Sequence, residues 1–528
     1  LTPAGWSGGR LAQMAEDEEQ LTERCEVEKP LFYHGPRFKL CSQDREQQRT
    51  YSLLCYNAAC DLVCAVEDGA CAAYGGAELV KQNKDLASFS KLATTPKCRI
   101  PTKSPAIIVS TNEEGAALVC IVQEGGVLSV YSAEEALKGN AKEVYSVTLD
   151  EEEIVQISWK EDDFLCVCES GRTFLVHPQD STYFCVHEPA DFAPICAAAI
   201  PRSDFALLAG DPPEDEDTGA NLWAVDLLSA DSWPLFPEDM PGSLQDHLVY
   251  GSLRGLRVVP RKDWQAGTPL DVVCMLVSEE DGAPLTLQVV LSVNADARSA
   301  SVKVVATNEI YMHEHVDQQQ LHSVWIPDWS IMIMGTTATT DIVVLSGHES
   351  VQSSYIARPW APLGSPEGKQ LSCPSQQSDM ALTFCRGICV LTSFKGEIPR
   401  ERQSDPCMVD PVVVLLAADD GTVNFHFCDH NLPAPASSRQ PAPLRIKTPG
   451  ATGASSKASP FAPSAASGSG GSLGAGTSPS PFSESKPVAK DGSLAGTPFA
   501  GGGAFATGAS PFGGPTAGAS PFQAPGGS

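Results

Sequence analysis

The sequence predicts an all-β protein, a seven-bladed β-propeller followed by a disordered tail. From about residue 45 to residue 430, short apolar runs alternate with acidic or Gly-containing turns, and long helical periodicity is scarce. Such turns between β-rich runs are typical of hairpins, because Gly supplies the positive φ that a tight hairpin requires. The last part of the chain is nearly all Gly, Ser, Ala, Thr and Pro, which is typical of disorder.

Seven hairpins can be placed in order along the chain, each joining two apolar runs through a short polar turn. The paired runs are 61–66 with 70–74, 117–122 with 127–131, 164–168 with 173–177, 205–208 with 222–225, 272–277 with 285–290, 331–334 with 342–345, and 412–416 with 423–427. Their spacing fits four-stranded blades with longer insertions in some of them. The repeated signature of WD40 blades is absent, so we expect a divergent propeller. Two stacked β-sandwiches are the alternative, since they contain short strands at similar spacing.

Composition divides the chain into four segments. We predict a partly disordered N-terminal extension over residues 1–44, the propeller over 45–431, a Pro-rich extended linker over 432–449 and a disordered tail over 450–528. The chain begins at Leu1, and Met14 is the expected natural start. The tail pattern stops in mid-repeat at Ser528, so we expect further sequence beyond it.

The folded part of the chain is strongly acidic. The formal net charge is -29, yet the tail from Asn431 onward holds six Lys or Arg against two Asp or Glu. A surface of this sign repels phosphate backbones and attracts basic partners, which argues against direct binding of nucleic acid. The eighteen cysteines lie mostly inside apolar runs and form no evenly spaced framework, which predicts buried, reduced thiols in a cytosolic or nuclear protein. No apolar run reaches 18 residues, so no helix is expected to insert into a membrane.

No residue pattern predicts catalysis, a cofactor or a complete metal site. Phosphate loops, nucleophile elbows and the HExxH motif are absent, and the carboxylates gather in turns, where they are usually solvated. The segment 313–315, His-Glu-His, places two imidazoles on one face of a strand, which could form half of a metal site. No third ligand follows at a spacing typical of metal sites. Cys166 and Cys168 are interpreted as buried thiols. In the cluster 426–430, alternation predicts that Phe427 points inward and that the other residues lie in a turn.

Phenylalanine recurs in the tail, where the tripeptide Ser/Thr-Pro-Phe appears five times. A segment this poor in aliphatic residues cannot bury enough apolar surface to order itself, and ordinary disordered linkers are depleted in aromatic residues. Recurrent rings on flexible spacers therefore predict a string of weak binding points whose summed avidity is high. The predicted binding residues are Phe461, Phe482, Phe499, Phe505, Phe512 with Gly513, and Phe522. A plain linker with chance phenylalanines is the alternative.

Three stretches of the propeller carry a resemblance to a known family. The stretch 331–345 has an apolar strand, a small-residue turn, a Thr-acid pair and a second strand, with Trp329 in the turn before it. The final hairpin, 411–427, and the first stretch, 51–69, are the other two. With a propeller followed by a Phe-containing tail, the chain resembles the cytoplasmic-face nucleoporins of the CAN oncoprotein type. The likeness covers roughly 380 residues of propeller in outline.

The resemblance implies a non-enzymatic nucleoporin at the cytoplasmic side of the nuclear pore complex, acting in mRNA export without a cofactor. The propeller would dock the DEAD-box mRNA-export helicase, and docking would oppose the binding of RNA to the helicase. The tail would bind nuclear transport receptors, and other nucleoporins would be further partners. By position, the helicase contact falls on Asp341, Gly347, His348, Glu349 and Ser350. The chain departs from the family in two respects, since the family's basic residue falls on or near Gly347 or His348, and Phe512-Gly513 is the sole literal Phe-Gly pair.

A cytosolic trafficking adaptor is the alternative function. In that case the propeller is a scaffold, and small peptide-binding domains recognise the Ser-Pro-Phe motifs. The scarcity of Asn-Pro-Phe and Asp-Pro-Phe disfavours it.

Overall fold

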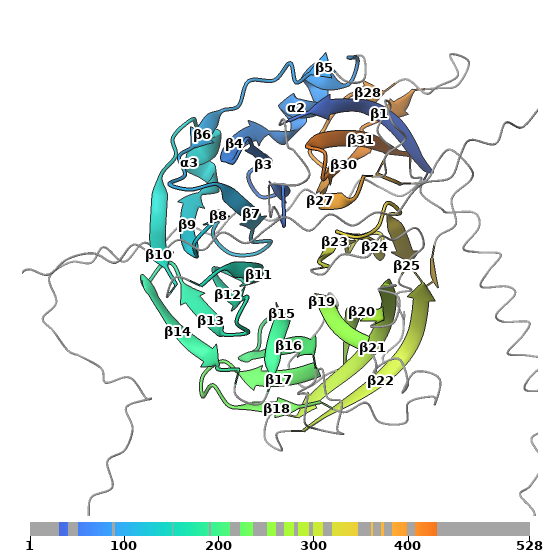
Figure 1. Ribbon diagram of the computed structural model, residues 1–528. Coiled ribbons are helices and arrows are strands. Elements are labelled where there is room, and N and C mark those ends of the chain that lie inside the picture. The colour runs from blue at the N-terminus through green and yellow to red at the C-terminus, as the bar shows by residue number, and fades with distance from the viewer. Residues whose placement is uncertain are drawn as a thin grey trace, which may run out of the picture. The chain divides into compact units, whose positions relative to one another are not determined.

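Seven β-sheets stand around a common axis in the computed structural model, which confirms the predicted seven-bladed propeller and not the stacked sandwiches (Figure 1). The structure describes residues 31–40, 51–86, 90–149, 152–189, 192–211, 222–235, 251–259, 269–278, 284–294, 299–309, 319–346, 361–362, 371–373, 383–398 and 407–429. The chain divides into two units, Leu1–Ala451 and Thr452–Ser528. The second unit lies wholly outside the described residues, so the boundaries of the linker and tail stay predictions.

In six blades the strands follow chain order from the axis to the rim. They are β2 (Leu54–Asn57), β3 (Leu62–Glu67), β4 (Ala70–Gly75) and β6 (Cys98–Ile100) in the first; β7 (Ala106–Thr111), β8 (Leu118–Gln123), β9 (Val127–Ser132) and β10 (Glu143–Thr148) in the second; β11 (Ile154–Lys160), β12 (Asp163–Cys168), β13 (Thr173–His177) and β14 (Thr182–His187) in the third; β15 (Ala193–Ala199), β16 (Phe205–Asp211), β17 (Leu222–Asp226) and β18 (Ser232–Pro234) in the fourth; β19 (Gly251–Val259), β20 (Leu270–Ser278), β21 (Pro284–Asn294) and β22 (Ser299–Glu309) in the fifth; and β23 (Leu321–Ile326), β24 (Ile331–Thr336), β25 (Val343–Ser346) and β26 (Ala361–Pro362) in the sixth.

The seventh blade combines the two ends of the propeller. Its strands are β27 (Cys385–Leu391), β30 (Val412–Ala418), β31 (Thr422–Asp429) and β1 (Leu31–Lys39), and the short β5 (Ser90–Lys91) pairs in parallel with β1. Helices α2 (Gly76–Asn83) and α3 (Ala133–Leu137) lie in the connections between the third and fourth strands of blades one and two. The strand pair β28 (Glu397–Ile398) and β29 (Met408–Val409) lies in the connection between β27 and β30 of blade seven.

The seven predicted hairpins are the second and third strands of the seven blades, β3–β4, β8–β9, β12–β13, β16–β17, β20–β21, β24–β25 and β30–β31. The second strand lies between two neighbouring blades, so both of its faces are covered. Every residue of β3, β8, β24 and β30 is buried. This explains why these segments are continuous apolar runs and do not alternate between apolar and polar residues.

Tight turns close the hairpins as their glycines predict. In the turn between β3 and β4, Asp68 has a φ of 48° and Gly69 a φ of 79°, the left-handed pair that a type I′ turn requires. Gly126, with a φ of 71°, closes β8–β9, and a Cβ there would lie 2.1 Å from the carbonyl oxygen of Glu152. Only glycine fits this position without a backbone shift.

The hydrophobic core is divided among the spaces between neighbouring blades. One cluster joins blades seven, one and two around Phe38, Leu62 and Ile121, and a second joins blades two, three and four around Phe164. Smaller clusters lie between blades four and five, six and seven, and five and six. Each blade is therefore stabilised by contacts with both neighbours, and the fold depends on a closed ring.

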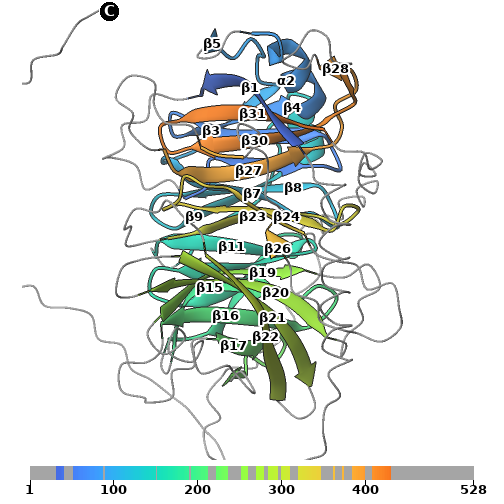
Figure 2. The ribbon, with the colours of Figure 1, turned by 90° about the vertical axis from the view of Figure 1, so that its right-hand side faces the viewer.

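Strand β1 closes that ring by pairing antiparallel with β31, the last strand of the propeller. Figures 1 and 2 both show β1 beside β31. Its side chains Phe32 and Phe38 are 2% and 0% exposed. The predicted N-terminal extension of residues 1–44 therefore contains a strand of the propeller. The sequence concealed it because Gly35-Pro36 interrupts the apolar pattern and its partner lies almost 400 residues away.

A buried ion pair fixes the register of this closure. Nη2 of Arg37 lies 3.3 Å from Oδ2 of Asp420 in the turn between β30 and β31, and Nε of Arg37 donates to the Thr422 hydroxyl at 3.3 Å. Asp420 also accepts from the backbone N–H and the hydroxyl of Thr422. A buried pair of this kind specifies one alignment, because a slipped register would leave both charges buried without a partner.

Candidate functional site

Of the predicted helicase-docking residues, the structure describes Asp341 alone. Asp341 precedes β25, whereas Gly347, His348, Glu349 and Ser350 follow its last residue, Ser346, and lie outside the described residues. A strand rises by about 3.3 Å per residue, so Asp341 and Ser346 are about 16 Å apart along β25. The strand therefore separates Asp341 from Ser346, the last described residue of this stretch.

The small-residue turn before β25 is buried and hydrogen-bonded to itself. Thr336, Thr337 and Thr339 are each 0% exposed. Thr336 N–H donates to the Thr339 hydroxyl at 3.1 Å, and the Thr336 hydroxyl accepts from Ala338 N–H at 3.1 Å. Thr337 exchanges two bonds with Gln320, which precedes β23. The turn therefore holds blade six together and offers little surface to a partner.

Asp341 ends this turn in a half-buried position. Its backbone pairs with that of Ser372 in an isolated antiparallel bridge. Burial raises the pKa of its carboxyl group above the ordinary value. Asp341 thus combines a fixed backbone with a carboxylate that is partly withdrawn from water.

We call the side of the propeller on which β25 ends at Ser346 the docking face. Ile331 at the start of β24 pairs with Ser346, so this face also carries the turn Pro327–Ser330 between β23 and β24. Because the strands within each blade are antiparallel, the connections from first to second strand of every blade lie on this face, and so do the connections from third to fourth strand of blades one to six.

Polar side chains on the docking face join neighbouring blades. The contacts are Ser393 hydroxyl to Asp61 between blades seven and one, Asn57 to the Thr111 hydroxyl at 2.8 Å between blades one and two, Ala116 N–H to Asp162 between blades two and three, and Lys160 to Asp204 at 3.1 Å between blades three and four. Asp61 and Asp162 are therefore structural acceptors, although carboxylates in turns are usually solvated. Their shared position, in the turn between the first and second strands, is the signal that could have identified them.

One contact crosses the axis on the same face. Nη2 of Arg257 at the end of β19 lies 2.6 Å from Oε1 of Glu113, which follows β7. These residues belong to blades five and two, so the pair links two blades that are not neighbours. Glu113 is mostly exposed, which keeps the contribution of the pair to stability small.

Five turns of the docking face in blades two to four are acidic, whereas the segment between β9 and β10 on the same face carries the exposed Lys138 and Lys142. Among the described residues of the turns after β7, β11, β13, β15 and β17, Arg202 is the one exposed cation, and the exposed carboxylates are Glu113, Glu114, Glu161, Asp180 and Asp204. Glu113 pairs with Arg257, and Asp204 pairs with Lys160. This part of the face therefore attracts basic surfaces.

The turn between β17 and β18 presents an apolar side chain within these acids. Leu228 is 73% exposed. The Asp226 carboxylate accepts from Leu228 N–H at 2.8 Å, and the Ser229 hydroxyl donates to Asp231 at 3.0 Å, so the turn is held in one shape. A rigid, exposed leucine between two carboxylates is a feature that the hydrophobic pattern alone did not single out.

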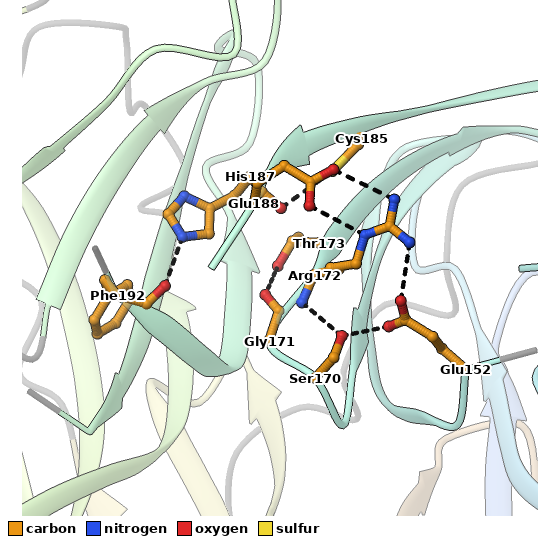
Figure 3. Close-up of polar contacts among 9 residues, drawn as sticks. All are labelled: Glu152, Ser170, Gly171, Arg172, Thr173, Cys185, His187, Glu188 and Phe192. Atoms are coloured by element: carbon orange, nitrogen blue, oxygen red, sulfur yellow. Dashed lines mark hydrogen bonds and ion pairs between the residues drawn. The ribbon is translucent and has the colours of Figure 1, made fainter. Parts of the chain in front are cut away.

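Among the described residues of the opposite face, the ionic cluster around Arg172 is structural. Arg172 forms two bonds with Glu188, at 3.2 and 3.3 Å, and one with Glu152 at 2.9 Å, as Figure 3 shows. Its guanidinium also stacks 4.9 Å from the centre of the Phe174 ring. The Ser170 hydroxyl donates to the other oxygen of Glu152. These groups satisfy one another, and the cluster clamps the turn between β12 and β13 to its neighbours.

The thiols and histidines singled out from the sequence lie in the core where they are described. Cys166 and Cys168 are 0% and 1% exposed, both are free, and burial raises the pKa of each thiol. His426 and Cys428 are 1% and 2% exposed strand residues of β31. The expectation that they lie in a turn is therefore wrong, because β1 pairs with this strand and covers it.

Several predicted features cannot be placed. The segment 313–315 and the tail residues Phe461, Phe482, Phe499, Phe505, Phe512, Gly513 and Phe522 lie outside the described residues. Within the part of the chain that the structure describes, no three His, Cys, Asp or Glu side chains are grouped as a metal site would require. No described helix is long and apolar enough to cross a membrane.

Comparison with known proteins gives likenesses of structure only. No protein-family model matches the chain, and no curated protein matches it by sequence. The propeller is similar to the crystal structure of the N-terminal domain of Nup159, with a TM-score of 0.51 and 11% identity over 76% of this chain and 96% of that one. It is also similar to a chain of the S. cerevisiae complex of Dbp5 with Nup159, Gle1, IP6 and ADP, with a TM-score of 0.50 and 13% identity over 76% and 96%. At these identities, the two likenesses establish a shared propeller fold.

Proposed function

We propose that this chain is a non-enzymatic nucleoporin at the cytoplasmic side of the nuclear pore complex, acting in mRNA export. Its propeller docks the DEAD-box mRNA-export helicase, and its Phe-containing tail binds nuclear transport receptors, with other nucleoporins as neighbours. The observation that carries the proposal is the likeness of the propeller to the Nup159 domain, present in a structure with Dbp5. Six phenylalanines in the tail of the same chain support it.

The electrostatics of the docking face suit such a partner. The surface by which a DEAD-box protein binds RNA is basic, because it must attract phosphates. Exposed carboxylates on this face would attract it, and the polar contacts between blades would hold those carboxylates in fixed positions. A helicase bound through its RNA-binding surface cannot hold RNA at the same time.

Reversing the charge of Glu349 tests the docking site. Glu349→Lys is expected to weaken helicase binding by about 1–3 kcal/mol if the carboxylate meets a desolvated arginine, and by far less if it is a rim charge. Calorimetric titration at low and high salt measures this, and association should slow as salt rises. The matched control is Glu124→Lys, an exposed carboxylate in the turn between β8 and β9 on the opposite face. Failure of the purified propeller to bind its own organism's helicase at low salt would contradict the proposal.

Competition with RNA separates docking from incidental binding. The helicase loaded with single-stranded RNA is expected to bind the propeller more weakly than the free helicase does, because the two ligands share one surface. Equal binding with and without RNA would show that the propeller contacts a different part of the helicase.

The tail makes a separate prediction. Changing the six phenylalanines 461, 482, 499, 505, 512 and 522 to Ser should abolish capture of transport receptors, because the rings supply avidity. Thermal unfolding of the propeller is the internal control and should not change. Receptor capture equal to that of the unaltered chain would refute this role for the tail.

A further inference from the structure

Strand β14 leaves the outer edge of blade three unprotected. In the described part of the chain no further strand pairs with it, and Figure 1 shows it on the outside of the ring. Folded proteins usually protect such an edge, because its unpaired backbone N–H and C=O groups can pair with another chain. Among the other outermost strands, β6, β18 and β26 have only two or three residues, β5 covers β1, β22 carries Lys303, and β10 begins with Glu143. The six residues of β14 include no Lys, Arg, Asp, Glu or Pro.

We call Thr182–Cys185 the open edge, because this part of β14 is both exposed and regular. Its four residues pair one to one with β13, and a bulge follows at Val186. The first two residues are exposed and the other two are half-buried. A regular strand with water on its outer side presents its backbone groups at the spacing that an added strand needs.

Two aromatic rings of the open edge lie on opposite faces of the sheet. Tyr183 packs edge-on against Phe174, with 5.9 Å between ring centres, and Phe184 stacks on His177 at 5.5 Å. The Tyr183 side chain remains 38% exposed. Aromatic and β-branched residues pair favourably with such rings across neighbouring strands. The open edge therefore suits an added strand that has two consecutive apolar residues, one opposite each ring.

The charges of blade three favour a basic partner. Its described residues, 152–189, hold eight Asp or Glu against two Lys or Arg. Both cations, Lys160 and Arg172, already form ion pairs with carboxylates. Asp180 is exposed in the turn that leads into β14. A second copy of this chain fits poorly, because antiparallel pairing through the same edge would set Asp180 of one copy against Glu188 of the other.

We propose that the open edge binds an extended segment of a partner protein, which adds a fifth strand to blade three. The segment has apolar residues opposite Tyr183 and Phe184, and a Lys or Arg opposite Thr182, where it can meet Asp180. Outside the described residues, this chain has no Lys or Arg directly next to two consecutive large apolar residues, so the partner is a separate protein. This surface is on blade three and is separate from the blade-six residues of the helicase proposal.

Binding of a short peptide to the full chain tests the proposal. The probe is fluorescently labelled Thr-Lys-Val-Ile-Lys-Thr, which has a cation on each side of the apolar pair and can therefore pair in either direction. Fluorescence polarisation is expected to show saturable binding that weakens as salt rises, whereas the counterpart with Glu in place of Lys should not bind. Hydrogen exchange in β14 should slow when the basic peptide is bound.

Two N-methylated peptides separate strand pairing from charge attraction. Each carries methyl groups on one of the two alternate sets of backbone N–H groups, and only one set faces β14 in an added strand. One form should therefore bind about tenfold or more weakly, because its bonds to β14 are lost, and the other should bind like the parent. Equal binding of the two forms would overturn the proposal.

A pair of variants places the peptide on this edge. Tyr183→Lys should weaken binding about tenfold or more, because it removes a ring and puts a cation on the edge. Thr148→Lys is the matched control, since it adds the same charge at an exposed position of β10 in blade two and should leave binding unchanged. Thermal unfolding shows that both variants remain folded. Absence of saturable binding, or unchanged binding in Tyr183→Lys, would refute the assignment. Sedimentation showing a dimer that Tyr183→Lys dissociates would assign the edge to a second copy and would also refute it.

Discussion

Replacing Phe38 by Ala is expected to lower the free energy of unfolding of the propeller by about 3–5 kcal/mol. The ring of Phe38 is 0% exposed and packs edge-on against Phe425, with 5.2 Å between ring centres. It belongs to the core cluster that joins blades seven, one and two. Because β1 closes the propeller by pairing with β31, the cavity left by Phe38→Ala weakens this closure as well as the local packing.

Urea denaturation measures this change, and a rim aromatic from another blade provides the matched control. Phe184 lies half-buried on β14, where it stacks on His177 at 5.5 Å. Phe184→Ala should cost distinctly less, since less apolar surface is lost. Hydrogen exchange of β1 and β31 should also rise in Phe38→Ala and stay unchanged in the control. Equal destabilisation by the two substitutions would contradict the role of β1 as the closing strand.

The sequence predicted the middle of every blade because two independent signals agree there. The second strands are buried on both faces, so their sequences are continuous apolar runs, and acidic-Gly turns mark where the chain reverses. The innermost and outermost strands carry weaker signals. Strand β10, for example, has mixed exposure, and β26 spans only two residues. Strand β1 could not be found by local pattern, since its neighbour in space is the far end of the propeller.

The candidate site was less predictable for a geometric reason. A resemblance assigns residues by their order, and Asp341 is close in order to Ser346, yet β25 carries the chain between them from one side of the blade to the other. Asp61 and Asp162 each accept a hydrogen bond from a neighbouring blade, which the residues next to them in the sequence do not reveal. In both cases the missing information was the packing of one blade against the next.

His426 illustrates how such packing changes the chemistry of a residue. It was expected in a turn, but β1 pairs with β31, and the ring is 1% exposed beneath His34, with 4.9 Å between ring centres. Both ring nitrogens are buried with no hydrogen-bond partner. Burial, and to a lesser degree His34, lowers the pKa of the ring to about 3. His322 is lowered to about 3 as well, chiefly by burial and then by Arg386.

These two histidines make the stability of the propeller dependent on pH. Their pKa values in the folded chain lie below the value of about 6.5 for an unfolded histidine, so the unfolded chain binds protons more readily. The stabilisation is fully present above pH 6.5 and is lost as the pH falls towards 3. Each ring contributes a slope of up to about 1.4 kcal/mol per pH unit in that window, so the free energy of unfolding should drop by about 2–3 kcal/mol between pH 7.5 and pH 5.5.

Urea denaturation across this pH range separates the two contributions. His426→Leu should remove about half of the drop and leave the propeller more stable at pH 5.5 than the unaltered chain, because it also removes two unsatisfied nitrogens from the core. Unperturbed carboxylates titrate near pH 4, so this window isolates the histidines. His177→Gln is the control, because His177 is a half-buried histidine of β13 that contacts Asp163 at 2.8 Å. It shows how loss of a different imidazole changes the dependence of the free energy of unfolding on pH. If His426→Leu and the unaltered chain lose the same free energy of unfolding between pH 7.5 and pH 5.5, the His426 imidazole does not determine how the stability of the propeller depends on pH.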